Sequence, residues 1–365
     1  MNHVVAHSGQ NFDYELNEVF WKDLQLRAPS YSLNVPEGKL AQRIADMIVR
    51  LDEVFEREEP DAMLILGDTN SCLAATLTAK RRKIPIFHME AGNRCFDQRV
   101  PEELNRKVID HLSDINLAHT EHSRRYLIAE GIRPETVIKT GSPVKEVLDR
   151  HMVRIQASDI LGQLQLKSGE YFLVSAHREE NIDSEENFRD LFATLNALAE
   201  RFRKPIIVST HPRTRKKMQS MGIREDDGNI RFLKPFGFID YIHLQMNAHC
   251  VISDSGTITE DSSILNFPAV TIRQAHERPE GMDEGTLIMC GLKADRVLEA
   301  VAAVISQHSA ARREFRIVSD YDTDNVSKKV VRVIMSYTDY VNRTVWHRAA
   351  QPAGTANPAM TTQAI

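Results

Sequence analysis

The chain has 365 residues, which is too long for one typical hydrophobic core, so we expect two domains of α/β size. Its mild net charge of -5 gives no reason to expect a nucleic-acid partner, and the basic clusters at 80–83 and 213–217 are short enough to be solvated helix faces. No apolar run approaches the roughly 20 residues that a membrane span needs, and the first residues show no signal-peptide pattern.

Strands are expected where short continuous apolar runs occur, because such runs suit parallel strands that are buried on both faces. In chain order these runs cover residues 3–6, 62–66, 84–87, 115–118, 137–140, 171–175, 205–209, 230–232, 250–252 and 269–272. Amphipathic segments such as 40–57, 187–202 and 240–248 lie between them, so right-handed βαβ crossovers are the simplest topology. The pattern predicts two doubly wound, Rossmann-like α/β domains.

The domain boundary is expected near Gly141 to Asp149, where the first strand pattern stops. This gives an N-terminal Rossmann-like domain at 1–143, a C-terminal one at 144–335 and a helix at 336–350 that packs back. Residues 351–365 are Ala, Thr, Pro and Gln without periodicity, which predicts a disordered tail. The first strand of an open parallel sheet is usually central and leads into a ligand-binding turn, and none fits before Met1. We therefore expect a first strand to be missing.

The four cysteines, Cys72, Cys95, Cys250 and Cys290, are far apart and form no C-x-x-C pair. Three of them fall in or near apolar segments where a small buried thiol fits. A reducing, cytoplasmic location is therefore expected.

A helix is predicted to begin at Pro101, because proline suits the first helical position and Leu104, Val108 and Leu112 follow at a spacing of four. Gly92 permits a tight exit from the strand before it.

Glu90 and Glu102 are expected to flank one crevice at the end of that strand and the start of that helix. A structural role remains open, because Glu102 and Glu103 also offset a helix dipole, and Glu102 with Arg106 is an ordinary i, i+4 pair.

Polar side chains follow many of the predicted strands at the point where each strand ends. In open α/β sheets ligands bind outside these carboxyl ends. Taken singly, Asp68 could be a helix N-cap, His177 a satisfied core histidine and Ser255 a cap. Their recurrence at corresponding strand ends instead predicts a ligand site made of Asp68, Glu90, His177, Arg178, His211 and Asp254–Ser255–Gly256–Thr257.

The Ser255–Gly256–Thr257 turn opens a helix and suits a phosphate, because free backbone N–H groups and the helix dipole favour an anion. Arg278, in the stretch ERPE, could bring a guanidinium to the same diphosphate. Neither G-x-G-x-x-G nor G-x-x-x-x-G-K-[ST] occurs, which argues against a tightly held NAD and against a P-loop nucleotide site. We expect no cofactor.

No metal is expected either. The pair His88 and Glu90 matches half of a zinc deaminase signature, but the required P-C-x-x-C is absent. His119 and His122 are spaced as possible ligands, and no third ligand is evident.

Five segments carry a resemblance to a known family: GDTNSCLAA, HMEAGNRCFDQRVPEELNRK, SAHREEN, DSGTITEDSS and ERPE, in this order. Together they resemble the non-hydrolysing UDP-N-acetylglucosamine 2-epimerases, which implies the two-domain glycosyltransferase-B arrangement. Three segments are similar to the branch of this family that converts UDP-N-acetyl-L-pneumosamine to UDP-N-acetyl-L-fucosamine: HSGQNFDYELN, EAGNRCFD and KPFGFIDY. A UDP-sugar substrate and a homodimer are implied as well, with products used in surface polysaccharides such as capsule or O-antigen.

The resemblance implies anti-elimination of UDP across C1 and C2, then re-addition through a 2-acetamidoglycal with the C2 proton returned to the opposite face. It assigns these catalytic duties among Asp68, Glu90, Glu102 and His177, without deciding which carboxylate serves which face. The resemblance places the substrate and nucleotide contacts at Arg106, Arg178, His211, Ser255, Gly256, Thr257, Asp261 and Arg278.

Two departures from the family pattern bear on this expectation. Asp261 stands where the family usually has the glutamate that holds the ribose hydroxyls, so its reach is shorter. The family also begins with a strand and a G-T-R-P-E turn, which precede the point where this sequence starts.

Other classes remain open. UDP-N-acetylglucosamine is the alternative epimerase substrate. A glycosyltransferase of the same fold, a hydrolysing epimerase and an inactive chain that only binds UDP-sugar are the remaining alternatives.

Overall fold

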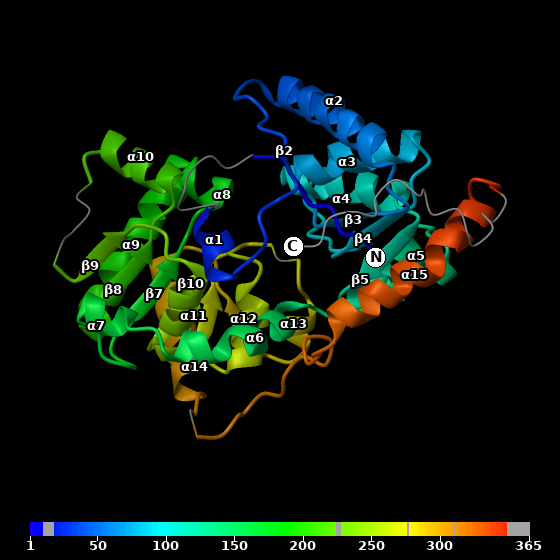
Figure 1. Ribbon diagram of the computed structural model, residues 1–365. Coiled ribbons are helices and arrows are strands. Elements are labelled where there is room, and N and C mark those ends of the chain that lie inside the picture. Colours follow the sequence, from blue (N-terminus) through cyan, green and yellow to red (C-terminus); the bar gives the residue numbers. More distant parts are fainter. Residues whose placement is uncertain (10–17, 224–227, 276, 310, 349–365) are drawn as a thin grey trace, which may run out of the picture.

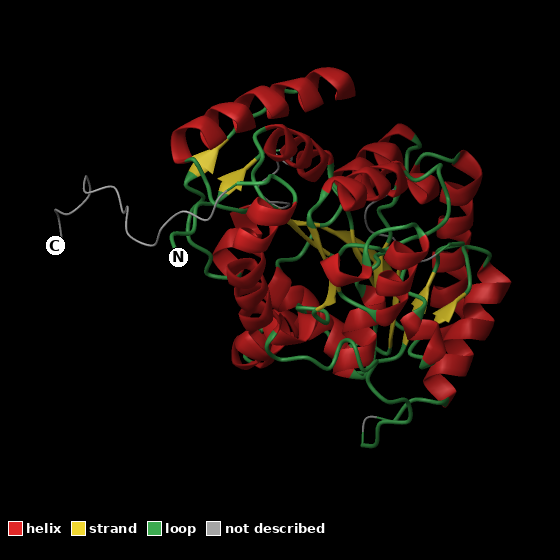
Figure 2. Cartoon of the chain, turned by 90° about the vertical axis from the view of Figure 1, so that its right-hand side faces the viewer, coloured by secondary structure: helices red, strands yellow, loops and turns green. Residues whose placement is uncertain are grey.

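The computed structural model describes residues 1–9, 18–223, 228–275, 277–309 and 311–348. They form two lobes, each built around a parallel sheet with helices packed about it (Figures 1 and 2). The disordered tail expected at 351–365 lies outside the described residues.

The N-terminal lobe contains two separate groups of parallel strands. β1 (Ala6–His7) pairs with β2 (Tyr31–Ser32), and a four-stranded sheet has the order β3-β4-β5-β6. Its strands are β3 (Met63–Leu66), β4 (Ile86–Met89), β5 (Ile115–Ala118) and β6 (Val137–Lys139). The helices of this lobe are α2 (Leu40–Glu58), α3 (Asn70–Arg81), α4 (Pro101–Leu112) and α5 (Glu121–Ala129), with a 3-10 turn at Pro134–Thr136. The short α1 (Glu18–Asp23) precedes them in the chain and lies near α11.

The C-terminal lobe contains a six-stranded parallel sheet with the order β12-β11-β10-β7-β8-β9. Its strands are β7 (Phe172–Ser175), β8 (Ile206–Ser209), β9 (Ile230–Leu233), β10 (Cys250–Ser253), β11 (Ala269–Thr271) and β12 (Ile288–Met289). The order reverses between β7 and β10, and the crevice at such a switch point is where open α/β sheets bind ligands.

Helices cover both faces of this sheet, and its two apolar faces form separate buried clusters. The helices are α6 (Val144–Gln156), α7 (Ile160–Leu164), α8 (Glu179–Ile182), α9 (Glu185–Phe202), α10 (Pro212–Ser220), α11 (Phe238–Asn247), α12 (Ile258–Leu265), α13 (Glu280–Asp283) and α14 (Ala294–Ser306). Parallel α/β architecture is therefore confirmed in both lobes, and the strand-order reversal of a doubly wound sheet is seen in the C-terminal lobe.

The last described helix, α15 (Val326–Thr344), returns to the N-terminal lobe, where Figure 1 shows it beside β5 and α5. Val326 and Val330 on its inner face pack against Phe87 of β4 and Ile115 of β5. The helix begins ten residues before the expected residue 336, because the apolar positions that face the sheet start at Val326.

The apolar spacing on α4 predicted the wrong inner face. Leu104 and Val108 are 50% and 45% exposed, whereas Glu103, Arg106 and Asp110 are buried. The inner face of this helix is mostly a polar network with the buried Ile109 beside it, whereas Leu104 and Val108 point outward.

Strand β3 pairs only with β4 among the described strands, and its side chains alternate between buried and exposed. Met63 and Ile65 pack in the core with α2 and α3, whereas Leu64 and Leu66 are 44% and 54% exposed. One face of this edge strand is therefore uncovered.

Candidate active site

Arg278 is held between carboxylates of the two lobes. Its Nη2 lies 3.0 Å from Oε1 of Glu90, which follows β4, and its Nε lies 2.9 Å from Oε2 of Glu260 in α12. Glu260 also accepts a hydrogen bond from the hydroxyl of the buried Ser142, which precedes α6. Two of the predicted site residues, Glu90 and Arg278, are thus brought together.

Arg106 makes the reciprocal link from the N-terminal lobe. Its Nε lies 2.7 Å from Asp68, and its Nη1 lies 3.0 Å from the buried Glu103. Its Nη2 lies 3.0 Å from Glu277, the neighbour of Arg278. Although burial opposes it, Arg106 and Arg273 lower the pKa of the Glu277 carboxyl to about 2. The site therefore alternates fixed negative and positive charges across the junction between the lobes.

Asp254 organises the residues that follow β7. Its fully buried carboxylate accepts hydrogen bonds from the backbone N–H groups of His177 and Arg178 at 2.9 Å and from the side chain of Asn181. It also lies 3.2 Å from Nδ1 of His177, whose ring stacks on His211 with centroids 6.2 Å apart. One carboxylate thus fixes both predicted residues of the β7 turn and orients the imidazole.

The turn after β10 has the features of an anion site. The Ser255 and Thr257 hydroxyls lie 3.0 Å apart at the start of α12, where the first backbone N–H groups have no helical partner. A Cβ built on Gly256 would lie 2.5 Å from Nη1 of Arg278. Glycine is therefore needed here for space, so that the guanidinium can lie against the turn.

Two carboxyls near this junction hold their protons more tightly than usual. Burial raises the pKa of the Glu90 carboxyl above its ordinary value, and Arg278 opposes that shift. Burial raises the pKa of Asp261 to about 7, while a hydrogen bond from Gln245 at 3.2 Å works against it. A carboxyl whose pKa lies nearer to neutrality is better suited to exchange a proton at physiological pH. Glu90 also has a left-handed backbone, with φ of 65°, and strained residues of this kind cluster at functional sites.

Glu102 is not brought into the described network. It is partly exposed on the first turn of α4, and within the described part of the chain no hydrogen bond or ion pair includes it. The next residue, Glu103, is fully buried and accepts hydrogen bonds from the backbone of Cys95 and Phe96.

Sequence reasoning also missed the supporting residue Arg94. This buried guanidinium lies 2.8 Å from Asp110 and 2.6 Å from Glu130, while Asp110 lies 2.8 Å from Nδ1 of His88. These contacts fix the loop between β4 and α4. Its only signal was its position four residues after Glu90.

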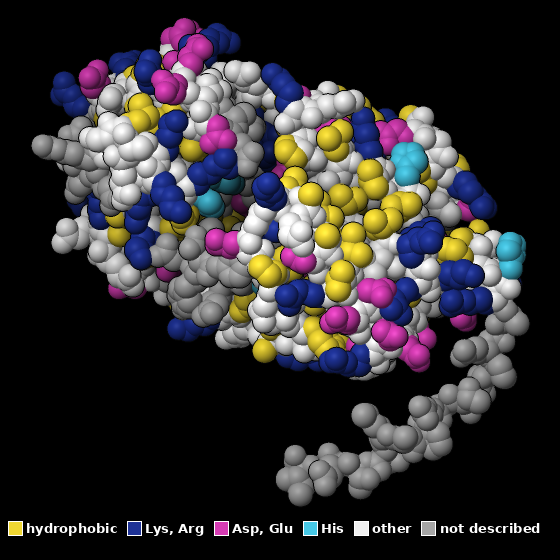
Figure 3. Space-filling model, turned by 90° about the horizontal axis from the view of Figure 1, so that it is seen from above, with side chains coloured by type: hydrophobic (Ala, Val, Ile, Leu, Met, Phe, Trp, Pro, Cys, Tyr) yellow, Lys and Arg dark blue, Asp and Glu magenta, His cyan; other side chains and the backbone are white. Residues whose placement is uncertain are grey.

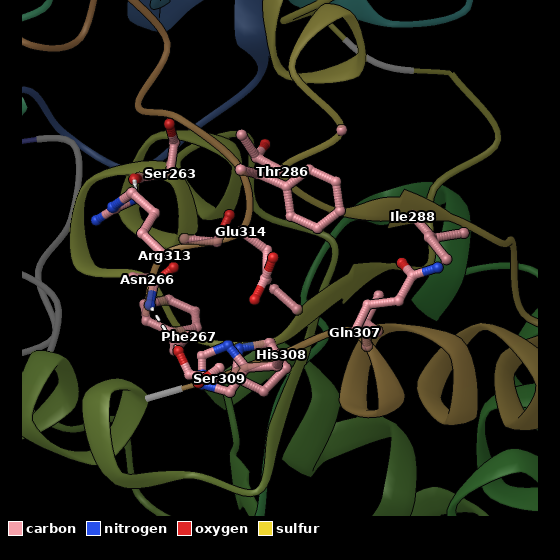
Figure 4. Close-up of a pocket in the computed structure, with 16 residues that line it drawn as sticks. Ser263, Asn266, Phe267, Thr286, Ile288, Gln307, His308, Ser309, Arg313 and Glu314 are labelled. Atoms are coloured by element: carbon pink, nitrogen blue, oxygen red, sulfur yellow. Dashed lines mark hydrogen bonds between the residues drawn. The ribbon is translucent and has the colours of Figure 1, made fainter. Parts of the chain in front are cut away.

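A small hollow of about 60 Å³ lies elsewhere, at the other end of α12 (Figure 4). Arg313 donates there to the backbone carbonyls of Ser263 and Ile264, and Asn266 donates to that of Ser309. The Ser255–Thr257 turn, which suits a diphosphate, is at the start of α12, whereas this hollow is at its end. The hollow is therefore separate from the candidate active site at the junction between the lobes.

Within the described ranges no group of three or more His, Cys, Asp or Glu side chains is placed to hold a metal ion. The four cysteines are free. None of the helices in the described ranges is long and apolar enough to cross a bilayer.

Comparison with known proteins identifies the family of the chain. The family described as "UDP-N-acetylglucosamine 2-epimerase" matches residues 1–335. A curated protein of that description from Methanococcus maripaludis is 32% identical over 310 residues, covering 83% of this chain and 85% of its own.

Solved structures of similar proteins also match. A UDP-N-acetylglucosamine 2-epimerase from Rickettsia bellii is 54% identical, with a TM-score of 0.88, and the match covers 95% of this chain and 92% of that one. The Methanocaldococcus jannaschii UDP-GlcNAc 2-epimerase, solved in complex with UDP-GlcNAc and UDP, is 28% identical with a TM-score of 0.84, covering 91% of each chain.

Proposed function

Because the chain belongs to the UDP-N-acetylglucosamine 2-epimerase family, we propose that it inverts C2 of a UDP-N-acetylhexosamine. One observation carries the proposal. The cross-lobe network of Glu90, Arg278, Arg106 and Asp68 puts carboxylates for proton transfer beside guanidinium groups for a diphosphate. A transferase that only moved the sugar would have no use for several carboxylates near C1 and C2.

The reaction has two halves that mirror each other. In the first half the bond between C1 and the UDP oxygen breaks and a base takes the proton from C2, which leaves UDP and a 2-acetamidoglycal. In the second half a proton is delivered to the opposite face of C2, and the UDP oxygen bonds again to C1. Atoms and charges balance over the cycle, and no oxidant or reductant is needed.

Departure of UDP must lead, because the C2 proton is not acidic in the ground state. Positive charge then builds at C1, and nearby carboxylates stabilise it. The diphosphate would be received by the backbone N–H groups of the Ser255–Thr257 turn, by Arg278 and Arg178, and by His211 on the nucleotide side. Asp261 would hold the ribose hydroxyls.

Proton transfer at C2 needs acid or base groups on both faces, and we propose Asp68, Glu90, Glu102 and His177 for these duties. Glu90 is favoured because burial raises the pKa of its carboxyl. Asp68 is oriented by Arg106 at 2.7 Å. Glu102 would need to approach the sugar from its place on the first turn of α4.

We propose UDP-N-acetyl-L-pneumosamine as the substrate and UDP-N-acetyl-L-fucosamine as the product, for use in a surface polysaccharide such as capsule or O-antigen. The segments EAGNRCFD and KPFGFIDY support this branch. The third supporting segment, HSGQNFDYELN, lies mostly outside the described residues. The second candidate is interconversion of UDP-N-acetylglucosamine and UDP-N-acetylmannosamine, which is favoured by the family description and by the Rickettsia bellii relative.

Proton NMR in deuterated buffer tests these alternatives. The protein would be incubated separately with UDP-N-acetyl-L-fucosamine and UDP-N-acetylglucosamine while the C2 and anomeric signals are followed. We expect deuterium at C2 and a second anomeric signal, with total UDP nearly unchanged and the L-sugar faster. Net release of UDP with free sugar would instead identify a hydrolase. Binding of UDP without exchange would identify an inactive binding chain.

We also propose that the chain forms homodimers in the cytoplasm. Figure 3 looks down on the side of the molecule where α2 lies, and hydrophobic side chains gather there over the N-terminal lobe. Exposed apolar residues on the helices of this lobe include Val49, Leu77, Leu104 and Val108.

The four free cysteines support a reducing compartment. Sedimentation equilibrium would give twice the 41.5 kDa chain mass for a dimer.

A further inference from the structure

The loop after β4 presents an aromatic ring in a strained backbone conformation. Phe96 is 68% exposed and has φ of 56°, in the left-handed region that bulky side chains avoid. Strain of this kind persists only where the surroundings fix it. Here the Glu103 carboxylate fixes it by accepting the backbone N–H groups of Cys95 at 3.0 Å and Phe96 at 3.2 Å.

The same carboxylate connects this loop to the candidate catalytic residues. Glu103 lies 3.0 Å from Nη1 of Arg106, and Nε of Arg106 lies 2.7 Å from Asp68. The conformation that exposes Phe96 is therefore set by the group that also orients the Arg106–Asp68 pair. The backbone of Phe96 is thus tied to the residue that holds this pair, while its ring offers most of its surface to solvent.

The Phe96 ring also has a partner that places it at the junction between the lobes. It packs edge-to-face on Tyr126 of α5, with centroids 5.2 Å apart and planes at 89°. Tyr126 neighbours His122, whose Nε2 lies 2.6 Å from Asp283 of α13 in the other lobe. Phe96 and Tyr126 therefore form an aromatic wall on the N-terminal side of the junction.

We infer that Phe96, backed by Tyr126, is a specificity-determining residue that contacts the C5–C6 edge of the sugar and selects a 6-deoxy sugar. This rests on the proposed function and deepens it by naming the residue that selects the proposed 6-deoxy substrate. A C6 methyl adds apolar contact with the ring. A C6 hydroxyl in the same place would lose water and gain no partner from a phenyl group.

The size of this selection has a physical limit. Apolar pockets discriminate by only about 10- to 100-fold against a substrate that adds a single hydroxyl. We therefore expect the protein to prefer UDP-N-acetyl-L-fucosamine over UDP-N-acetyl-L-galactosamine, which differs only by the C6 hydroxyl, by a factor in that range.

The experiment measures the ratio of affinities for these two UDP-sugars by calorimetry, and the ratio of their exchange rates at C2 by NMR. Phe96→Ala is expected to reduce the preference to about 3-fold or less, with the affinity for UDP alone unchanged because UDP lacks the hexosamine that would contact the ring. Phe96→Gly gives the same loss without backbone strain, which keeps the test valid if the alanine variant folds poorly. Phe315→Ala is the matched control, because Phe315 is an exposed phenylalanine that lines the hollow at the far end of α12.

The outcomes separate this inference from the proposed function. An unchanged preference in both Phe96 variants, or a wild-type protein without preference, overturns the inference even if epimerisation is normal. A preference that vanishes in the variants while no deuterium enters C2 supports the inference and rejects the epimerase activity. Failure of the wild-type protein to bind either UDP-sugar overturns both.

Discussion

Arg278 of the C-terminal lobe places its Nη2 3.0 Å from Oε1 of Glu90 in the N-terminal lobe. A residue proposed to bind the diphosphate therefore already pairs with a residue proposed to move a proton. Arrival of a diphosphate would compete with Glu90 for this guanidinium, which would weaken the pairing of the carboxylate as the substrate binds.

Arg278→Lys should weaken both binding and turnover. Lysine retains the charge, but it lacks the planar guanidinium with which Arg278 can contact Glu90, Glu260 and a diphosphate together. We expect the Kd for UDP to rise about 10- to 100-fold and kcat/KM to fall at least as much. Calorimetry with UDP checks the first effect. Arg316→Lys, at an exposed pair with Glu284, is the control and should leave both constants unchanged. Equal behaviour of the two variants would contradict a diphosphate role for Arg278.

Gly256→Ala should weaken UDP binding through a steric clash alone. The added Cβ would lie 2.5 Å from Nη1 of Arg278, so the guanidinium must move away from the turn. We expect about 10-fold or greater loss of UDP affinity, of the size seen when a charged hydrogen bond is disturbed, with the fold retained. Gly38→Ala is the matched control, because nothing lies within 4 Å of its added Cβ. Wild-type affinity in Gly256→Ala would show that the diphosphate binds elsewhere.

Asp68→Asn should separate catalysis from binding. The amide keeps the size of the side chain but removes the negative charge beside Arg106. Loss of a proton-transfer group typically lowers kcat by about 10²- to 10⁴-fold, whereas UDP affinity should stay within about 3-fold because the predicted diphosphate contacts are elsewhere. Deuterium incorporation at C2 and calorimetry measure the two quantities. Asp149→Asn, at an exposed pair on α6, is the control. A kcat near the wild-type value would remove Asp68 from the proposed mechanism.

Asp261→Asn should change how stability depends on pH. Burial raises the pKa of Asp261 to about 7 in the folded protein, against an ordinary value of 3.8 for an exposed aspartate. The folded state therefore keeps a proton that the unfolded state releases, so this group lowers the free energy of unfolding as pH rises from about 4 to about 7. Between pH 5 and pH 8 the free energy of unfolding of the wild-type protein should fall by about 2–3 kcal/mol more than that of Asp261→Asn, as measured by urea unfolding. Parallel pH profiles for the two proteins would mean that Asp261 is ionised in the folded state. Asp149→Asn should follow the wild-type profile.

Much of the fold follows from apolar runs, because parallel strands buried on both faces leave a strong signal. The run at 115–118 matches β5 residue for residue, and the expected helix at 40–57 matches α2 to within one residue. β2 and β12 have two residues each, which is too short for any periodicity to register. The start of α15 was missed by ten residues for a different reason, since contact with a distant sheet decides which of its turns are buried.

The candidate site was only partly predictable. Residues directly after strands, such as Asp68 and Glu90, were found because topology alone brings strand ends together. Which of Glu102 and Glu103 is buried depends on the rotation of α4, and the spacing of Leu104 and Val108 does not reveal that rotation. The inner face of that helix carries Glu103, Arg106 and Asp110, so binary patterning fails where a polar network replaces a core. Ser142 left no signal, because its partner Glu260 is 118 residues away.

The uncovered face of β3 has a consequence for the behaviour of the protein in solution. Its outer edge has no partner among the described strands and lies beside two half-exposed leucines, which is the kind of surface that allows strand addition. Concentrated samples are expected to associate through this edge, independently of any dimer made through helices. Such growth would bind amyloid dyes, and lysine at position 64 or 66 should suppress it, since charge on an edge strand blocks strand pairing. The same property makes a short extended peptide, added in trans, a candidate stabiliser of the N-terminal lobe.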